Sequence, residues 1–258
     1  MYPVLFRIGS FEITSFGVMV ALGAGLGILV LRRELIRRHL DDGAGTDAAL
    51  VGVLGGLAGA KLLYVLEHLD EPLTSTLFSR AGMSWFGGLT GGIVAGLAII
   101  SWRRLPVVAA LAAAAPALTL GQGVGRIGCF LVGDDYGRPT SLPWGVAFPE
   151  GLPPTTDRVH PTQLYEAAVL FAVTPLLIRW RRQGVSDMRV FARYLMIAGA
   201  VRFLIELVRV NVRVALGLTT AQLFALGAVA LGFVLEVVYA RRQVPPAAVR
   251  PRAHPARR

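Results

Sequence analysis

Seven long apolar runs follow one another along the chain, and they constrain the fold more than any other feature. A helix needs about 20 mostly apolar residues to cross the hydrocarbon core of a bilayer. Runs of about this length occupy residues 13–31, 47–66, 84–102, 105–124, 161–180, 190–209 and 219–240. We therefore predict an all-α polytopic membrane protein with about seven transmembrane helices, built as a single transmembrane domain over residues 1–240.

The composition favours a membrane protein over a soluble one. Charged residues make up 16% of the chain and hydrophobic residues 54%, whereas soluble domains usually carry about 25% charged residues. The net charge of +10 comes almost wholly from arginine. Because these arginines lie beside the apolar runs, they indicate the cytoplasmic ends of membrane helices rather than a nucleic-acid surface. We expect no nucleic-acid partner.

Pairs of arginines set the expected orientation. They follow runs one, three, five and seven, at residues 32–33, 103–104, 181–182 and 241–242. Since such residues concentrate on the cytoplasmic side of a membrane, the N-terminus is expected outside and the C-terminus inside. Residues 126–160 then form a small extracytoplasmic loop region. The Pro-, Ala- and Arg-rich tail 241–258 is expected to be disordered and cytoplasmic, and Pro116 is expected to kink the fourth run.

Polar and ionisable side chains within the runs are expected to gather at the outer end. Arg126 closes run four, Gln163 and Glu166 open run five, and Arg202 and Glu206 lie one helical turn apart in run six. Charged groups inside a bilayer are costly, and they normally pair or face a cavity. We predict an Arg202–Glu206 pair. Either the whole set only holds the helices in register, or its arginines bind a lipid phosphate while its carboxylates orient them or move protons.

The segment from Gly125 to Thr140 is unusually rich in Gly, Asp and Arg for so apolar a chain. Glycine lets the backbone bend and approach a ligand closely. Arginine offers a planar fork of donors that suits phosphate or carboxylate. The segment therefore predicts a polar site at the edge of the membrane.

Three motifs resemble signatures of the prolipoprotein diacylglyceryl transferases. Residues 125–137 are similar to the family's Gly-Arg-aliphatic-Gly-Asn-Phe segment with its following Asn-Gly-Glu and Gly. Residues 160–166, His-Pro-Thr-Gln-Leu-Tyr-Glu, resemble the family's His-Pro-Ser/Thr-Gln-Leu-Tyr-Glu. Residues 202–209 resemble Arg-Phe-x-x-Glu-x-x-Arg, and Gln222 follows as in the family. The resemblance covers roughly residues 3–238.

The resemblance implies an architecture, a location and an activity. Family members have seven transmembrane helices and a small extracytoplasmic head, and they lie in the bacterial cell inner membrane. They modify exported proteins during lipoprotein biosynthesis. The diacylglyceryl group of phosphatidylglycerol is transferred to the lipobox cysteine thiol of a prolipoprotein, and glycerol-1-phosphate is released. Expected partners are therefore phosphatidylglycerol, prolipoprotein precursors and membrane lipids. No cofactor is implied, and the four scattered histidines suggest no metal site.

Position by position, the resemblance also implies site residues. Arg126 matches the arginine that contacts the phosphatidylglycerol headgroup, and Arg202 matches a second essential arginine. Together with Gly137 and Gln163, they are the expected phosphatidylglycerol-binding residues. The expected catalytic residues are Arg126, Arg202, Glu206, Glu166 and Asp134.

Several positions depart from the family pattern. Phe86 stands where the family has a histidine proposed as general base, Cys129 and Val132 replace asparagines, and Phe16 and Ala198 replace tyrosines. The pattern fits a divergent member of the family. Two alternatives to the prolipoprotein transferase therefore stay open: a paralogue that transfers from phospholipid to another acceptor, and a non-catalytic lipid-binding membrane protein.

The identity of the base also stays open. A free cysteine thiol has a pKa of about 8.5, so a base or a positive field helps to form the thiolate. Without a histidine at position 86, the candidates are His160, Asp134, Glu166 and Glu206. Cys129 is expected to be a small buried hydrophobic residue, with a nucleophilic role as the alternative.

Overall fold

A computed structural model describes residues 2–9, 11–78 and 82–242 of the chain. Within these residues the protein consists of eight helices and three two-stranded antiparallel hairpins. The helices are α1 (Ser15–Arg37), α2 (Asp42–Glu67), α3 (Leu73–Phe78), α4 (Trp85–Trp102), α5 (Val107–Val132), α6 (Thr162–Arg182), α7 (Asp187–Glu206) and α8 (Thr220–Arg242). The hairpins are β1 (Val4–Ile8) with β2 (Phe11–Thr14), β3 (Val146–Phe148) with β4 (Thr155–Val159), and β5 (Arg213–Ala215) with β6 (Leu218–Thr219).

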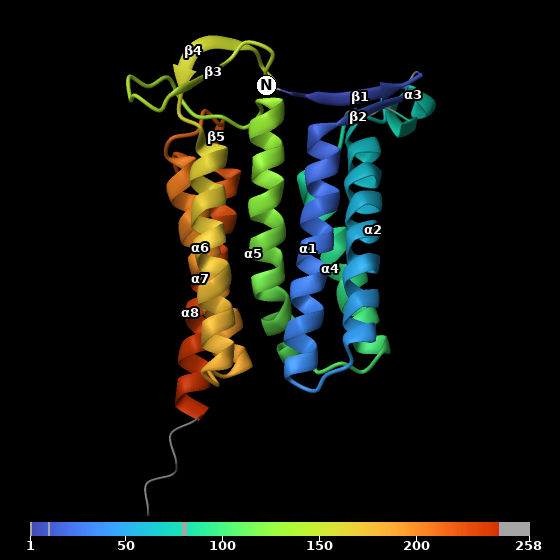
Figure 1. Cartoon of the computed structure of the whole chain (residues 1–258), viewed down its shortest axis with the longest axis vertical. Coiled ribbons are helices and arrows are strands. Elements are labelled where there is room, and N and C mark those ends of the chain that lie inside the picture. The colour runs from blue at the N-terminus through green and yellow to red at the C-terminus, as the bar shows by residue number, and fades with distance from the viewer. Residues whose placement is uncertain (1, 10, 79–81, 243–258) are drawn as a thin grey trace, which may run out of the picture.

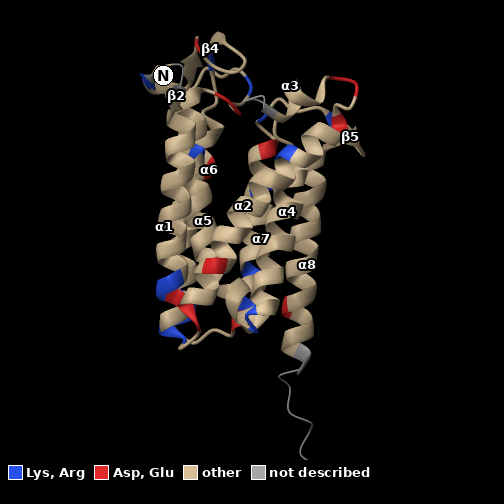
Figure 2. Ribbon diagram, turned by 90° about the vertical axis from the view of Figure 1, so that its right-hand side faces the viewer, with Lys and Arg blue, Asp and Glu red and all other residues tan. Residues whose placement is uncertain are grey.

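The long helices run side by side and alternate in direction (Figure 1). All three hairpins and the short helix α3 lie at one end of the bundle, which we call the head end. The α1–α2, α4–α5 and α6–α7 connections and the end of α8 lie at the opposite end. Charged residues lie mainly toward these two ends (Figure 2). The hairpins are small additions to the predicted all-α body, and they were not expected from the sequence.

Five of the long helices are apolar enough to cross a membrane, namely α1, α2, α4, α5 and residues 220–240 of α8. The chain is therefore a multi-pass membrane protein. Helices α6 and α7 have similar lengths, 21 and 20 residues. Both carry charged residues, such as Glu166 in α6 and Arg193 and Arg202 in α7, and the described residues include no further spans of sufficient hydropathy. The expected total of seven spans therefore stays a prediction.

Small residues let the helices pack closely. A Cβ atom on Gly59 of α2 would overlap the carbonyl oxygen of Gly87 in α4. In the other half of the bundle, a Cβ atom on Gly199 of α7 would lie 2.6 Å from the carbonyl oxygen of Ala225 in α8. Close backbone approach of this kind is a common way for membrane helices to associate.

Helix α5 is longer than predicted. We expected the fourth run to end at residue 124 and a loop region to begin at residue 126, but α5 continues to Val132 and is continuous through Pro116. Gly133 ends the helix in a left-handed conformation with a φ of +78°, which is a frequent way for helices to stop. Arg126 and Cys129 consequently lie on the last two turns of a helix, and the loop region begins at Gly133.

Helices α7 and α8 also end at residues other than those predicted. Helix α7 ends at Glu206 rather than at residue 209, so that Arg209 lies in the connection to α8. Helix α8 continues to Arg242. The tail predicted to be disordered comprises residues 241–258. Of these, residues 243–258 lie outside the described residues.

Candidate functional site

Arg126 links α5 to the start of α6 and to the loop that follows α5. Its Nε atom lies 2.9 Å from Oε2 of Glu166, and its Nη1 atom lies 2.8 Å from Oδ2 of Asp135. Gln122, one turn earlier on α5, donates from Nε2 to Oε1 of Glu166 at 3.1 Å. Both oxygens of Glu166 therefore have partners. Only 3% of this side chain is exposed.

Helix α7 and the connection after it contribute the next contacts. Nη2 of Arg202 donates to Oε2 of Glu206 at 2.7 Å, which confirms the predicted pair, and Nη1 of Arg202 lies 3.6 Å from Oε2 of Glu166. The Nε atom of Arg209 lies 3.8 Å from the same oxygen of Glu206. The Nη2 atom of Arg209 donates to Oδ1 of Asp135.

These contacts close a ring of six alternating charges, which we call the charge ring. In order around the ring, its members are Arg126, Glu166, Arg202, Glu206, Arg209 and Asp135. Three cations face three anions, so the ring has no net charge when all are ionised. Its members come from α5, α6, α7 and the two connections that leave α5 and α7 at the head end. Arg126 and Arg202 thus meet at one depth, at the same oxygen of Glu166.

Members of the ring differ in exposure. The side chain of Glu206 is fully buried, and that of Arg209 is 9% exposed. The side chain of Asp135 is 38% exposed. Asp135 also lies on a loop, whereas the two glutamates lie on helices. Asp135 is therefore the most accessible carboxylate of the ring.

The start of α6 fixes the loop that follows α5. Oγ1 of Thr162 donates to the carbonyl of Asp135 at 2.7 Å, and Nε2 of Gln163 donates to the carbonyl of Asp134. Gly137 is buried, and a Cβ atom there would lie 2.7 Å from a backbone carbonyl of the α7–α8 connection. Gln163 and Gly137, both expected to bind phosphatidylglycerol, therefore contact protein backbone in this structure and position the two aspartates.

The two adjacent aspartates differ in their protonation chemistry. Burial alone would raise the pKa of Asp135, but Arg209 and Arg126 outweigh this effect and lower its pKa to about 2. Burial raises the pKa of Asp134 above its ordinary value. Oδ1 of Asp134 is buried and has no hydrogen-bond partner among the described residues. The carboxyl group of Asp134 is thus easier to protonate than that of Asp135.

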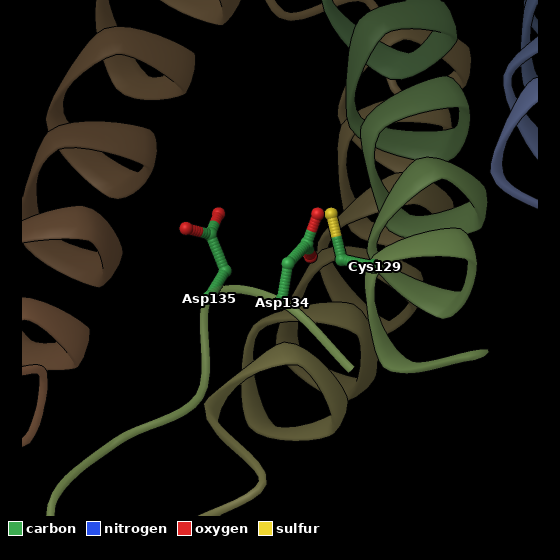
Figure 3. A group of neighbouring side chains, drawn as sticks. All are labelled: Cys129, Asp134 and Asp135. Carbon is green, nitrogen blue, oxygen red and sulfur yellow. The ribbon is translucent and has the colours of Figure 1, made fainter. Parts of the chain in front are cut away.

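Cys129, Asp134 and Asp135 each place a potential metal-ligand atom within 4.8 Å of the others. Figure 3 shows the sulfur of Cys129 beside the carboxylate of Asp134, with Cys129 on α5 and the aspartates on the following loop. Nη1 of Arg126 lies 3.9 Å from this sulfur, and Arg126 and Arg209 already hold the carboxylate of Asp135. Guanidinium charges at such distances oppose a metal cation, so this donor set does not fit a metal site.

The position at which the family has a histidine is apolar here. The ring of Phe86 in α4 packs against Trp85 and against Phe224 of α8, with centroid distances of 5.2 and 5.1 Å. His160 contacts the hydroxyl of Tyr165 through Nδ1 at 3.3 Å. Among the base candidates, Asp134 is therefore the one that combines a raised pKa with an unpartnered oxygen.

Four residues of the site were absent from the expected catalytic and phosphatidylglycerol-binding residues. Asp135 and Arg209 complete the charge ring, and Gln122 and Asn211 donate to its two glutamates. Arg209 had a signal in the sequence, because it closes the Arg-Phe-x-x-Glu-x-x-Arg motif. Nothing in the sequence separated Asp135 from Asp134 except the family pattern, which favoured Asp134.

Comparison with known proteins agrees with the motifs. The family model described as prolipoprotein diacylglyceryl transferase matches residues 3–238. A phosphatidylglycerol–prolipoprotein diacylglyceryl transferase of Clostridium tetani is 31% identical, over 94% of this chain and 100% of the relative. The protein of the same name from Geobacter sulfurreducens is 37% identical, over 95% of this chain and 97% of the relative. This chain belongs to the prolipoprotein diacylglyceryl transferase family.

Proposed function

We propose that this chain transfers the diacylglyceryl group of phosphatidylglycerol to the lipobox cysteine of a prolipoprotein. Its family and the names of its relatives support this activity. The observation that carries the proposal is the charge ring: three arginines from separate segments converge at one end of a membrane bundle, beside the half-buried carboxylate of Asp135. Such a cluster suits a phosphate headgroup at the membrane surface.

The proposed setting is the bacterial inner membrane, with seven spans that include α6 and α7 and with a single domain over residues 1–240. The N-terminus and the head end then face outward, and the C-terminus faces the cytoplasm. Arginines at the opposite end support this orientation, because positive residues concentrate on the cytoplasmic side. They include Arg32, Arg37, Arg103, Arg181 and Arg189.

The phosphate of phosphatidylglycerol replaces Asp135 in the ring. A phosphodiester carries one negative charge, as does the Asp135 carboxylate, so the exchange leaves the ring neutral. Arg126 and Arg209, which hold Asp135, then donate to phosphate oxygens, and Arg202 adds its positive charge from the far side of Glu166. Glu166 and Glu206, buried and fully partnered, keep the arginines in place.

The transfer itself forms one bond and breaks one. The thiol sulfur of the prolipoprotein attacks the glyceryl carbon that carries the phosphate ester. The carbon–oxygen bond breaks, its electron pair stays on the phosphate oxygen, and glycerol-1-phosphate leaves. Asp134 accepts the thiol proton. Arg126 and Arg202 stabilise the second negative charge that develops on the phosphate, which is commonly the largest contribution to such catalysis.

The test uses the purified full-length chain in vesicles that contain phosphatidylglycerol, with a lipobox peptide as acceptor. Glycerol phosphate and the thioether-linked peptide should form in equal amounts, and the chain should restore prolipoprotein modification in cells depleted of their own transferase. Phosphatidylglycerol bound without turnover would contradict the proposed catalysis. Release of glycerol phosphate that requires a different acceptor would contradict the proposed acceptor.

A further inference from the structure

A polar pocket that opens to the surface lies at the opposite end of the bundle from the charge ring. Its volume is about 250 Å³, and its lining residues come from the α6–α7 connection, α7 and α8. Figure 1 shows this connection at the end of the bundle opposite to the hairpins. Its lining residues are Gly184, Val185, Ser186, Arg189, Arg193 and Tyr239.

The start of α7 offers donors to this cavity. The first backbone N–H groups of a helix have no partner within the helix and attract anions. Ser186 holds the N-cap position of α7, but its hydroxyl does not cap the helix. The Oγ atom of Ser186 is buried and has no hydrogen-bond partner among the described residues.

The cavity also has an excess of positive charge. Arg189 and Arg193, one turn apart on α7, lie 3.5 and 3.4 Å from the same oxygen of Glu236 in α8. Two cations thus share one carboxylate, which leaves one positive charge uncompensated. The charge ring, by contrast, is neutral. The excess charge and the unpartnered Ser186 hydroxyl together favour an anion.

The position of the cavity favours a lipid as the source of that anion. It lies at the end of a bundle whose helices are long and apolar enough to span a membrane. The guanidinium of Arg193 lies 5.1 Å from the ring of Trp180, and that of Arg189 lies 5.7 Å from the ring of Tyr239. Trp and Tyr are enriched where membrane meets water, and basic pockets between membrane helices bind lipid headgroups.

We propose that this cavity binds the phosphate of an anionic phospholipid from the leaflet opposite to the charge ring. The guanidinium groups of Arg189 and Arg193, the Ser186 hydroxyl and the N-terminus of α7 surround the phosphate. Bound lipid there ties α7 to α8. The site does not depend on the transferase reaction, and it requires only that the helices span the membrane.

The test counts lipids retained by the purified full-length chain in mild detergent, by native mass spectrometry, after addition of phosphatidylglycerol. The double variant Arg189→Gln/Arg193→Gln should retain one lipid fewer than the wild type. The control Arg33→Gln/Arg179→Gln removes two exposed arginines at the same end and should retain the wild-type number. The single variant Arg189→Gln, which keeps the Arg193–Glu236 pair, should weaken retention severalfold and guards against misfolding of the double variant.

Three results would overturn the proposal. Equal lipid numbers in the wild type and the folded Arg189→Gln variant would remove the site. Equal retention of phosphatidylethanolamine would contradict the preference for an anionic lipid. Protection of the wild type from thermal unfolding by inorganic phosphate, to the same extent as by lipid, would assign the cavity to a free anion. Transfer activity is measured in parallel and should stay within about twofold in all variants, so failure of the transferase assignment is scored separately.

Discussion

Two charge clusters occupy opposite ends of the bundle, and they are built from the same residue types. At the opposite end from the ring, Arg181 contacts Glu34 at 2.9 Å and Asp187 at 3.0 Å, and Arg37 contacts Glu34 at 2.5 Å. We call these four residues the helix clamp, because they tie α1 to α6 and α7. The side chains of Arg181 and Glu34 are 0% and 2% exposed.

The clamp and the charge ring differ in solvent exposure and in whether their members lie on helices or on a loop. All members of the clamp lie on helices, and its central pair is sealed from solvent. The ring includes Asp135, which is 38% exposed and lies on a loop. A sealed pair of helical residues can only hold helices together, whereas a loop carboxylate can leave and be replaced by another anion. Of the two clusters, the ring is therefore the one that we propose as a binding site.

The largest expected effect comes from Arg126. Arg126→Lys keeps the positive charge but loses the planar fork that contacts Glu166 and Asp135 together. We expect kcat/KM for phosphatidylglycerol to fall about 1000-fold, as for loss of a strong transition-state donor, with little change in stability. Release of glycerol phosphate from vesicles measures the effect. Arg103→Lys, at an exposed ion pair, should leave the rate unchanged. A loss of less than tenfold in Arg126→Lys would place the phosphate elsewhere.

A substitution in the clamp should lower stability and leave activity nearly unchanged. Glu34→Gln leaves Arg181 buried with only one carboxylate partner, so we expect the free energy of unfolding to fall by about 3 kcal/mol. The activity of the folded fraction should stay near that of the wild type. The control is Asp47→Asn, at the exposed pair with Arg103, which should cost less than about 1 kcal/mol. Loss of activity at unchanged stability would show that the clamp is more than structural.

A variant of Asp134 tests the proposed transfer of the thiol proton to this carboxylate. Asp134→Asn should lower kcat about 100-fold, a typical contribution of a general base. In the wild type, kcat/KM should fall as the pH drops through the raised pKa of Asp134, because the protonated acid cannot accept the thiol proton. This acid limb should lie above the ordinary aspartate value of about 3.9 and vanish in Asp134→Asn. Phe86→His should change the rate less than twofold. A large gain in that variant would instead assign the base to position 86.

Much of the fold could be predicted from the sequence. The apolar runs correspond to α1, α2, α4, α5, α6, α7 and α8, because a stretch of about 20 apolar residues has few alternatives to a helix. The end of α5 could not be predicted, because Gly125, Gly128 and Gly133 are all plausible stops. Only Gly133 takes the left-handed conformation.

The four helical members of the charge ring were among the expected site residues, whereas Asp135 and Arg209, which lie in connections, were not. Arg202 and Glu206 meet because helical spacing places them on one face. The choice of Asp135 over Asp134 as the ring carboxylate depends on tertiary contacts, in particular the hydrogen bonds from Thr162 and Gln163 to the loop backbone. Spacing along the sequence does not contain that information.

The most direct test of exchange at the ring is the affinity for phosphatidylglycerol of Asp135→Asn, measured at equilibrium without an acceptor thiol. Removing the carboxylate removes the competitor of the phosphate and leaves Arg126 and Arg209 with an excess positive charge. The dissociation constant should therefore fall about fivefold, or about 1 kcal/mol, whereas Asp157→Asn, at an exposed strand position, should leave it unchanged. An unchanged or higher dissociation constant in Asp135→Asn would contradict the claim that lipid phosphate takes the place of Asp135.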